Sequence, residues 1–340
     1  MDSKELDQNA AAMVAPGKGI LAADESTGTI KKRFDKIGLE STFEARRAYR
    51  ELLFTAPDAD KHISGVILYD ETIRQQTSDG KPFPQLLASR GILPGIKVDA
   101  GAKALAGFPG ETVTEGLDGL RERLAEYRGL GARFAKWRAV IDIGASIPTQ
   151  ACLAANAEAL ARYAALCQEA SIVPIVEPEV LMDGDHAIER CEVVTDATLE
   201  IVFDALFLHR VRLEGMVLKP NMVIAGKKCP KQSRPEQVAE ATVRCLRRRV
   251  PAAVPGIAFL SGGQNETEAT LHLSLMNRLG NLPWELSFSY GRALQQSTLD
   301  AWKGKPGNVA AAQKAFQRRA KLNGLARDGS YDAAMEQAAA

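Results

Sequence analysis

Eight short apolar runs alternate with helical patterns along this chain of 340 residues, and this alternation limits the possible folds more than any other feature. The runs cover residues 19–23, 63–69, 93–98, 134–137, 172–177, 215–219, 256–261 and 286–290. Apolar residues at helical spacing lie between several of them, as in 151–169, 187–208 and 235–249. Alternating strands and helices predict a parallel sheet, and eight such units favour a closed α/β barrel, the (β/α)8 or TIM barrel, over an open doubly wound sheet.

The chain is predicted to form a single domain over residues 1–340. It contains no convincing repeat and no interdomain linker, and its length suits one large barrel with extensions. We expect a core over about 14–325, with residues 1–16 forming a helix laid against the barrel and residues 308–325 forming a final helix. Residues 328–340 are small and polar, so we expect a mobile tail there.

Bulk composition argues against several classes of function. The net charge of +1 gives no electrostatic case for binding nucleic acid or an acidic membrane. The five cysteines are widely spaced without a CxxC pair, and the charged N-terminus lacks an apolar signal segment. No run approaches the roughly 20 apolar residues of a membrane span. We therefore expect a reduced, cytoplasmic protein.

Three of the predicted strands carry a lysine at or near their ends, namely Lys97, Lys136 and Lys219. Pro220 stops the strand directly after Lys219. Burying an ammonium is costly, and burial commonly lowers the pKa of a lysine. A lysine that is partly neutral at pH 7 attacks carbonyl carbons and forms a Schiff base. The pattern predicts a shared pocket for an anionic carbonyl substrate.

Carboxylates are predicted to join these lysines, because the C-terminal ends of barrel strands meet at one site. Asp24 follows the first strand, Glu177 and Glu179 end the fifth, and all three are candidate catalytic residues. In this interpretation Lys219 is the nucleophile and Glu177 is the general acid for loss of water. Asp24 or Glu177 would be the base on the β-hydroxyl, and Lys136 would stabilise developing negative charge.

Two opposed groups of residues are predicted to bind phosphates. The first follows the seventh and eighth strands, where barrels usually hold phosphate. It consists of Ser261, Gly262, Gly263, Ser289, Gly291 and Arg292. The second consists of Ser26, Thr29, Arg33 and Lys97, and Arg138 is included among the substrate-binding residues.

Each of these features also has a plainer interpretation. A single strand-end lysine more often forms a salt bridge than acts as a nucleophile, so the companion residues carry the prediction. Asp24 could instead cap a helix that begins near Ser26. The stretch 261–263 alone is consistent with a turn. The run 183–186, Asp-Gly-Asp-His, suggests a metal site, but no second histidine has ligand spacing, and we interpret it as a loop before a helix.

Seven segments closely resemble class I fructose-bisphosphate aldolases and occur in that family's order. They are 21–28 (LAADESTG), 95–99 (GIKVD), 134–138 (FAKWR), 175–179 (IVEPE), 218–222 (LKPNM), 259–264 (FLSGGQ) and 288–294 (FSYGRAL). The resemblance runs from about Val14 to Leu325. It implies a (β/α)8 barrel, usually a homotetramer, that needs no cofactor or metal. The implied reaction, part of glycolysis and gluconeogenesis, cleaves fructose 1,6-bisphosphate to dihydroxyacetone phosphate and glyceraldehyde 3-phosphate.

The resemblance also assigns roles to individual residues. Lys219 matches the Schiff-base lysine, Glu177 the acid/base glutamate, and Asp24 and Lys136 their catalytic neighbours. Positions at the site of the ketose C1 phosphate match Ser261, Gly262, Gly291 and Arg292. Positions near the C6 phosphate match Ser26, Thr29 and Lys97, and Thr29 replaces a serine common in animal members.

One departure from the family concerns the tail. Animal members end in a tyrosine that aids proton exchange, whereas the last tyrosine here is Tyr331. Two rivals stay open: another Schiff-base barrel enzyme, such as a transaldolase or a monophosphate aldolase, and a non-catalytic scaffold that keeps the fold. The preference among fructose bisphosphate, fructose 1-phosphate and seven-carbon ketoses is also left open.

Overall fold

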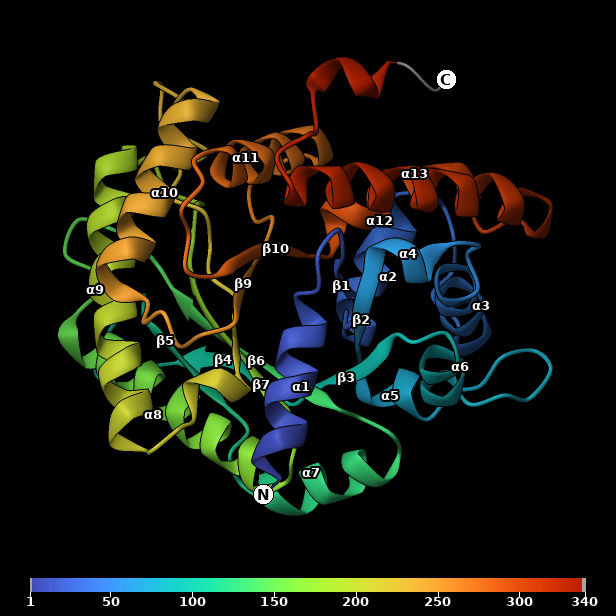
Figure 1. Ribbon diagram of the computed structural model, residues 1–340, viewed down its shortest axis with the longest axis horizontal. Helices are drawn as coiled ribbons and strands as arrows, with labels where there is room; N and C mark the ends of the chain where they lie inside the picture. The colour runs from blue at the N-terminus through green and yellow to red at the C-terminus, as the bar shows by residue number, and fades with distance from the viewer. Residues whose placement is uncertain (1, 338–340) are drawn as a thin grey trace.

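A closed barrel of eight parallel strands forms the core of the computed structural model, which describes residues 2–337. Around the ring the order is β1, β2, β3, β6, β7, β8, β9 and β10, which pairs again with β1 (Figure 1). The strands are β1 (Gly19–Ala22), β2 (Ile63–Leu68), β3 (Leu93–Lys97), β6 (Phe134–Ile141), β7 (Val173–Val180), β8 (Val217–Leu218), β9 (Gly256–Phe259) and β10 (Glu285–Tyr290). The predicted (β/α)8 barrel is confirmed, with one strand in each predicted run.

Strand lengths differ most from the prediction at β6, β7 and β8. β6 and β7 run on together to the pair Ile141 and Val180, beyond the predicted ends at 137 and 177. β8 has only two residues and follows a 3-10 turn, η1 (Leu213–Gly215). The backbone N–H of Lys219 nevertheless donates to the Val176 carbonyl at 2.8 Å. Lys219 is therefore held against β7 just beyond the end of β8.

Helices surround the barrel and close its N-terminal end. They are α1 (Ser3–Met13), α2 (Thr27–Asp35), α3 (Phe43–Phe54), α4 (Ala59–His62), α5 (Asp70–Ile73), α6 (Phe83–Ser89), α7 (Leu120–Gly129), α8 (Gln150–Glu169), α9 (Ile188–Leu208), α10 (Pro235–Arg249), α11 (Glu266–Arg278), α12 (Arg292–Trp302) and α13 (Val309–Arg327), with short 3-10 turns η2 (Pro306–Asn308) and η3 (Ala333–Glu336). The predicted helices at both ends of the chain are confirmed as α1 and α13. Figure 1 shows α1 in front of the strands, where Leu6, Ala10 and Met13 join the apolar filling of the barrel.

Glycines make room for one large ring inside the barrel. Phe134 is fully buried there, and a Cβ added to Gly95 would lie 2.2 Å from its ring. Because real Cβ atoms do not approach that closely, the aromatic side chain on β6 requires a glycine on the neighbouring strand β3.

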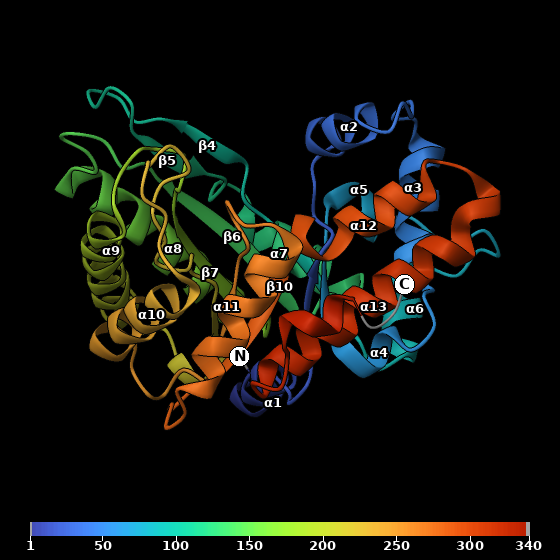
Figure 2. The same ribbon diagram turned by 90° about the horizontal axis from the view of Figure 1, so that it is seen from above.

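A two-stranded hairpin, β4 (Gly101–Ala104) with β5 (Thr112–Glu115), interrupts the connection from β3 to α7 and was not predicted. Most hairpin residues are partly or fully exposed and do not form the continuous apolar run by which the barrel strands were predicted. Thr114 fixes the hairpin to β6 and α8, because its hydroxyl donates to the Arg138 carbonyl and its N–H donates to the Asn156 side chain. Figure 2 shows the hairpin and α2 at the end of the barrel opposite α1.

A buried arginine joins the two ends of the chain. Arg327, the last residue of α13, donates hydrogen bonds to the carbonyls of Val14, Ala15 and Lys18 at 2.7–3.0 Å. It also pairs with Glu285 at 2.6 Å, at the start of β10. The segment that leads into β1 is therefore tied to the last helix and to the last strand.

The tail makes specific contacts up to Gln337. The Tyr331 ring is buried, and its hydroxyl donates to Glu336 at 2.7 Å. Glu336 also pairs with Arg319 of α13 at 2.7 Å, and the Tyr331 carbonyl accepts from Ser274 and Arg278 of α11. These contacts count against the predicted mobility for residues 328–337, while residues 338–340 lie outside the described residues. Mobility itself stays a prediction.

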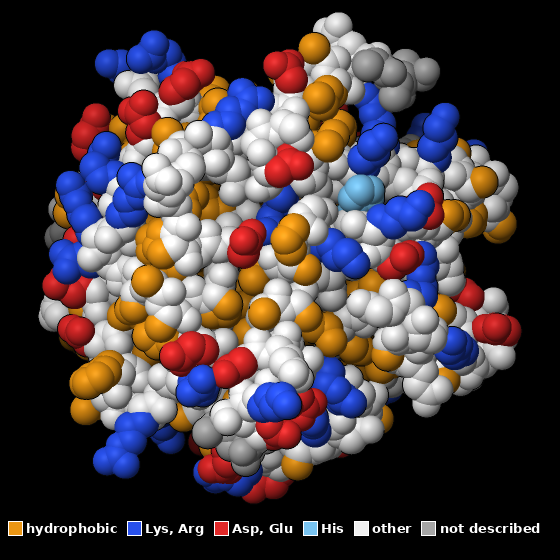
Figure 3. All heavy atoms as spheres, viewed as in Figure 1, with side chains coloured by type: hydrophobic (Ala, Val, Ile, Leu, Met, Phe, Trp, Pro, Cys, Tyr) orange, Lys and Arg blue, Asp and Glu red, His pale blue; other side chains and the backbone are white. Residues whose placement is uncertain are grey.

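Charges of both signs are interspersed on the face seen in Figure 3, in keeping with the net charge of +1. Among residues 2–337, no helix is both long and apolar enough to cross a membrane.

Candidate active site

A cavity of about 740 Å³ lies at the C-terminal ends of the strands and brings together almost every predicted site residue. The predicted residues that line it are Asp24, Ser26, Thr29, Arg33, Lys97, Lys136, Arg138, Glu177, Glu179, Lys219, Ser261, Gly262, Ser289, Gly291 and Arg292. Gly263 is the exception. Its φ of +80° is left-handed, and a Cβ there would lie 2.3 Å from Met182. Gly263 therefore serves the turn rather than the cavity wall.

Strand alternation directs the charged side chains into this cavity. Successive residues of a strand point to opposite faces, so Lys136 and Arg138 share the inner face of β6. Trp137 points outward instead and packs on Tyr163 of α8, with ring centroids 5.5 Å apart. In the register of β6 with β7, Arg138 lies opposite Glu177. The sequence of these two strands thus sets cations and carboxylates side by side.

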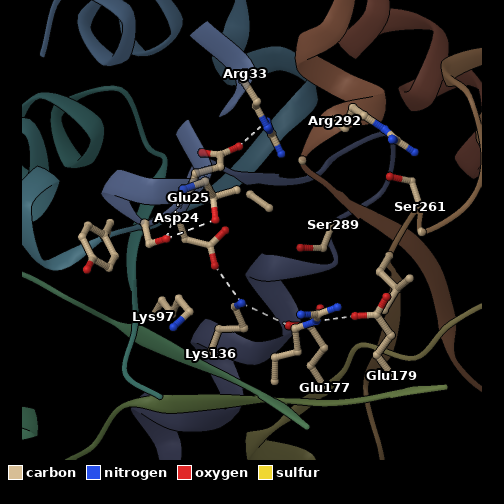
Figure 4. A pocket seen from close by; sticks show the side chains of 18 of the residues that line it. Asp24, Glu25, Arg33, Lys97, Lys136, Glu177, Glu179, Ser261, Ser289 and Arg292 are labelled. Carbon is tan, nitrogen blue, oxygen red and sulfur yellow. Dashed lines mark hydrogen bonds and ion pairs between the residues drawn. The ribbon is translucent and has the colours of Figure 1, made fainter. Parts of the chain in front are cut away.

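Four side chains form a continuous row of alternating charge, shown in part in Figure 4. Lys219 Nζ lies 3.2 Å from Glu177 Oε1, and Glu177 Oε2 lies 3.3 Å from Lys136 Nζ. Lys136 Nζ lies 2.7 Å from Asp24 Oδ2. Lys219, Glu177 and Lys136 are buried, each at most 4% exposed. The row joins four of the five residues predicted to be catalytic, and Glu179 is the fifth.

Asp24 does not cap a helix. The N-cap of α2 is Ser26, whose hydroxyl accepts from the Thr29 N–H at 3.4 Å. The Asp24 carboxylate is directed to Lys136 instead. The capping alternative is therefore wrong.

Opposite charges outweigh burial at both ends of the Asp24–Lys136 pair. Burial would raise the pKa of Asp24, but Lys136 and Lys219 lower it well below its usual range. Burial would lower the pKa of Lys136, but Asp24 and Glu177 raise it above its usual range. At neutral pH the cavity therefore holds a fixed carboxylate and a fixed ammonium beside Lys219.

The first predicted phosphate group lies at the ends of β9 and β10. Arg292 is the first residue of α12, so exposed backbone N–H groups and a guanidinium lie together there. No ion pair of the described residues 2–337 includes Arg292. Ser289 Oγ is buried, and no side chain or backbone group in that part of the chain hydrogen-bonds to it. These groups are suited to an anionic ligand.

The second predicted group is only partly separate from the first. Lys97 Nζ pairs with Asp99 at 2.6 Å, and Ser26 and Thr29 lie at the start of α2. Arg33 was predicted in this group, yet a Cβ added to Gly291 would lie 3.6 Å from its Nη2. Arg33 therefore lies beside the first group as well.

Glu179, which is labelled in Figure 4, forms an ion pair with Arg138 at the cavity wall. Burial would lower the pKa of Arg138, but Glu179 raises it above the usual range. The catalytic role predicted for Glu179 stays a prediction, since its carboxylate is directed to Arg138.

Several residues at or behind the cavity wall lie outside the set of predicted site residues. Lys32 of α2 and Lys36, the residue directly after that helix, line the cavity, and their spacing of four residues was an available signal. Glu25 also lines the cavity, and Arg50 lies buried behind it. Nothing in the sequence around Arg50 distinguishes it from the other arginines of α3.

The run 183–186 forms a loop that precedes α9, as predicted. In residues 2–337, no group of three or more His, Cys, Asp or Glu side chains is placed to hold a metal ion.

Comparisons with known proteins show the family to which the chain belongs. The family model for fructose-bisphosphate aldolase class-I matches residues 5–340. A "Probable fructose-bisphosphate aldolase class 1" of Xanthomonas campestris pv. campestris is 62% identical over 97% of this chain and 99% of its own length. "Fructose-bisphosphate aldolase 5, cytosolic" of Arabidopsis thaliana is 58% identical over 96% of this chain and 91% of its own length.

A solved structure extends the comparison to three dimensions. Fructose-bisphosphate aldolase from Plasmodium falciparum, crystallised with TRAP and a small-molecule inhibitor, superposes with a TM-score of 0.96 at 52% identity. The alignment covers 97% of this chain and 96% of that one. With the family model and the near full-length relatives, this shows that the chain belongs to the class I fructose-bisphosphate aldolase family.

Proposed function

We propose that this protein reversibly cleaves fructose 1,6-bisphosphate to dihydroxyacetone phosphate and glyceraldehyde 3-phosphate through a Schiff base on Lys219, within glycolysis and gluconeogenesis. The observation that carries the proposal is the row of Lys219, Glu177, Lys136 and Asp24 in one cavity. The names of the relatives support the same activity.

The first step forms the Schiff base. Lys219 Nζ attacks the ketone carbon and gives a carbinolamine, which must lose water. Glu177 lies 3.2 Å from Lys219 and donates the proton with which the hydroxyl leaves. The positively charged imine that results withdraws electrons from the adjacent carbon–carbon bond.

The second step breaks the bond between C3 and C4. A base removes the proton of the C4 hydroxyl, the aldehyde departs, and the bonding electrons form an enamine with the imine. Asp24, which is ionised at neutral pH, and Glu177 are the candidate bases for this proton. The charged Lys136 between them stabilises the developing negative charge. Protonation of the enamine and hydrolysis then release dihydroxyacetone phosphate and regenerate Lys219.

The two predicted phosphate groups in one cavity favour a ketose with phosphates at both ends over a monophosphate. Ser261, Gly262 and Arg292 would hold the C1 phosphate, and Ser26 and Lys97 the C6 phosphate. The rival transaldolase and monophosphate aldolase activities use one such group. Comparing kcat/KM for fructose 1,6-bisphosphate and fructose 1-phosphate decides between them.

We further propose that the protein is a cytoplasmic homotetramer. Two plant relatives are named cytosolic or cytoplasmic. Three large apolar side chains are exposed on α9: Val193 at 59%, Phe207 at 86% and Leu208 at 75%. Exposed apolar groups of this kind are typical of subunit contacts. Light scattering of the purified protein tests the proposed mass.

Borohydride trapping tests the chemistry directly. Reduction in the presence of dihydroxyacetone phosphate should attach the triose phosphate to Lys219, as identified by peptide mapping, and EDTA should leave cleavage intact. Lys219→Met should abolish both labelling and turnover, whereas the exposed-lysine control Lys314→Met should retain them. Activity that is lost to EDTA and restored by zinc would refute the proposal.

A further inference from the structure

A buried polar network lies behind the cavity wall, between the two predicted phosphate groups. It consists of Glu25, Arg50, Gln295 and Tyr49, and we call it the Glu25 network. Arg50 is 2% exposed, and Gln295 and Tyr49 are fully buried. Only Glu25 among the four lines the cavity. No step of the proposed reaction uses the other three residues.

The contacts of the network converge on one carboxylate. Arg50 Nη2 donates to Glu25 Oε2 at 2.7 Å, and Gln295 Nε2 donates to Glu25 Oε1 at 3.0 Å. Glu25 Oε1 also pairs with Arg33 (Figure 4). The side-chain oxygen of Gln295, Oε1, accepts a hydrogen bond from the Tyr49 hydroxyl at 3.0 Å. Burial raises the pKa of Glu25, but Arg33 and Arg50 outweigh it and lower the pKa, so the carboxylate is charged.

The network connects the elements that present the two phosphate groups. Glu25 directly precedes α2, which begins at the cap Ser26 and carries Thr29. Gln295 lies on α12, three residues after Arg292, and its amide also donates to the Ala22 carbonyl at the end of β1 at 2.8 Å. One carboxylate and one amide thus join α2, β1 and α12.

An aromatic cluster packs against this junction. Phe34 of α2, Tyr49 of α3 and Trp302 of α12 pack together, and the Tyr49 and Trp302 rings stack with centroids 5.2 Å apart. The Arg50 guanidinium lies 5.7 Å from the Tyr49 ring centroid. The polar contacts are therefore fixed from the outside by close packing.

We propose that Arg50 and Gln295 are positioning residues that, through Glu25, set the spacing between the two phosphate groups and so determine the preference for bisphosphate ketoses. This inference rests on the proposed function. A bisphosphate must contact α2 and α12 at once, whereas fructose 1-phosphate needs only the group on β9 and α12. Loss of the correct spacing should therefore penalise the bisphosphate selectively.

Stability alone does not account for the Glu25 network, and orientation of side chains at the cavity is a second role. Buried ion pairs often add little net stability, because desolvation offsets their attraction. A network that also presents Arg33 to the cavity has a use in orientation. A purely structural network would affect both ketoses equally when disturbed.

The test measures kcat/KM for fructose 1,6-bisphosphate and for fructose 1-phosphate in two variants. Arg50→Met removes one cation from Glu25, and Gln295→Met removes the amide that ties β1 to α12. Arg46→Met is the matched control, because Arg46 lies on the same helix as Arg50 and forms a similar ion pair, 2.6 Å from Glu71. Neither Arg46 nor Glu71 lines the cavity. Thermal melts of all proteins report the change in stability separately.

The measured quantity is kcat/KM for fructose 1,6-bisphosphate divided by kcat/KM for fructose 1-phosphate. We expect this ratio to fall about tenfold in Arg50→Met and in Gln295→Met, mainly because KM for the bisphosphate rises. Arg46→Met should leave the ratio unchanged, and Arg50→Lys should restore part of it. An unchanged ratio in both network variants, or equal losses on both ketoses, would overturn the inference while leaving the proposed function intact. If Arg50→Met does not fold, the Gln295→Met ratio decides alone. A wild-type protein that cleaves neither ketose would instead refute the proposed function.

Discussion

Replacing Lys136 by methionine is the sharpest test of the charge row. The Lys136 ammonium lies 2.7 Å from Asp24 and 3.3 Å from Glu177, and the residue is 4% exposed. At an effective dielectric constant of about 20, such contacts are worth roughly 5–6 kcal/mol each before desolvation. Desolvation offsets much of this, and removing one partner of a buried pair costs about 3–5 kcal/mol. Lys136→Met should therefore unfold more easily by about that amount at neutral pH, and should lose nearly all turnover.

The pH dependence of this loss follows from Asp24. In the wild type, folding lowers the pKa of Asp24 below its value in the unfolded chain. The ionised Asp24 therefore stabilises the folded state at every pH above the unfolded-state pKa, and this contribution is lost only as the pH falls through the folded-state pKa. Without Lys136 only Lys219 and Lys97 oppose the effect of burial, so the pKa of Asp24 lies higher than in the wild type and Asp24 takes up a proton at a higher pH. The stability difference between wild type and variant should therefore be largest at about pH 8 and should shrink toward about pH 5.

Guanidinium unfolding at several pH values measures this difference. Lys31→Met is the matched control, because Lys31 pairs with Asp35 at a similar distance of 2.9 Å but on the exposed surface of α2. Its cost should be at most about 1 kcal/mol and should change little with pH. A Lys136→Met cost no larger than that of Lys31→Met, or one that is independent of pH, would refute the account of the row.

Three further predictions concern the phosphates, the tail and the subunit contact. Arg292→Ala should weaken fructose bisphosphate and dihydroxyacetone phosphate alike by about 1.5–3 kcal/mol, whereas Lys97→Ala should penalise the bisphosphate more than fructose 1-phosphate; equal effects of both changes in steady-state kinetics would contradict the assignment. Deleting residues 336–340 should leave the cleavage rate nearly unchanged, because neither Glu336 nor Gln337 lines the cavity, but should lower stability by about 1–3 kcal/mol as the contacts of Glu336 with Tyr331 and Arg319 are lost; a large loss of cleavage or of tritium exchange would show a catalytic tail. Phe207→Asp should shift the mass measured by light scattering toward smaller species, and an unchanged mass would exclude this contact.

Strand positions were predictable because each barrel strand is buried on both faces. A continuous apolar run such as 172–177 can be recognised in the sequence without knowing which strands lie beside it. A lysine at the end of such a run stands out for the same reason. The row of Lys219, Glu177 and Lys136 could be anticipated for the same reason, since barrel topology fixes where strand ends meet.

The remaining features depend on contacts between distant segments. Arg50 reaches Glu25 from another helix, and nothing local separates it from the surface arginines around it. Gly262 and Gly263 are the same residue type and both lie close to Met182, yet only Gly263 has a left-handed backbone. The packing of Tyr331 depends on Ser274 and Arg278, more than 50 residues earlier in the chain, so the small and polar composition of the tail gave no sign of it.

Closure of the ring has a consequence for how the protein is made. β1 finds its second neighbour only in β10, and the segment before β1 is held by Arg327, 313 residues beyond Val14. During synthesis, the edge of β1 that later pairs with β10 therefore stays unpaired until almost the entire chain has left the ribosome. Contacts across so long a separation form slowly, because a large loop must close before they stabilise anything. We infer that the barrel closes after translation and that the nascent chain needs protection of its first strand until then.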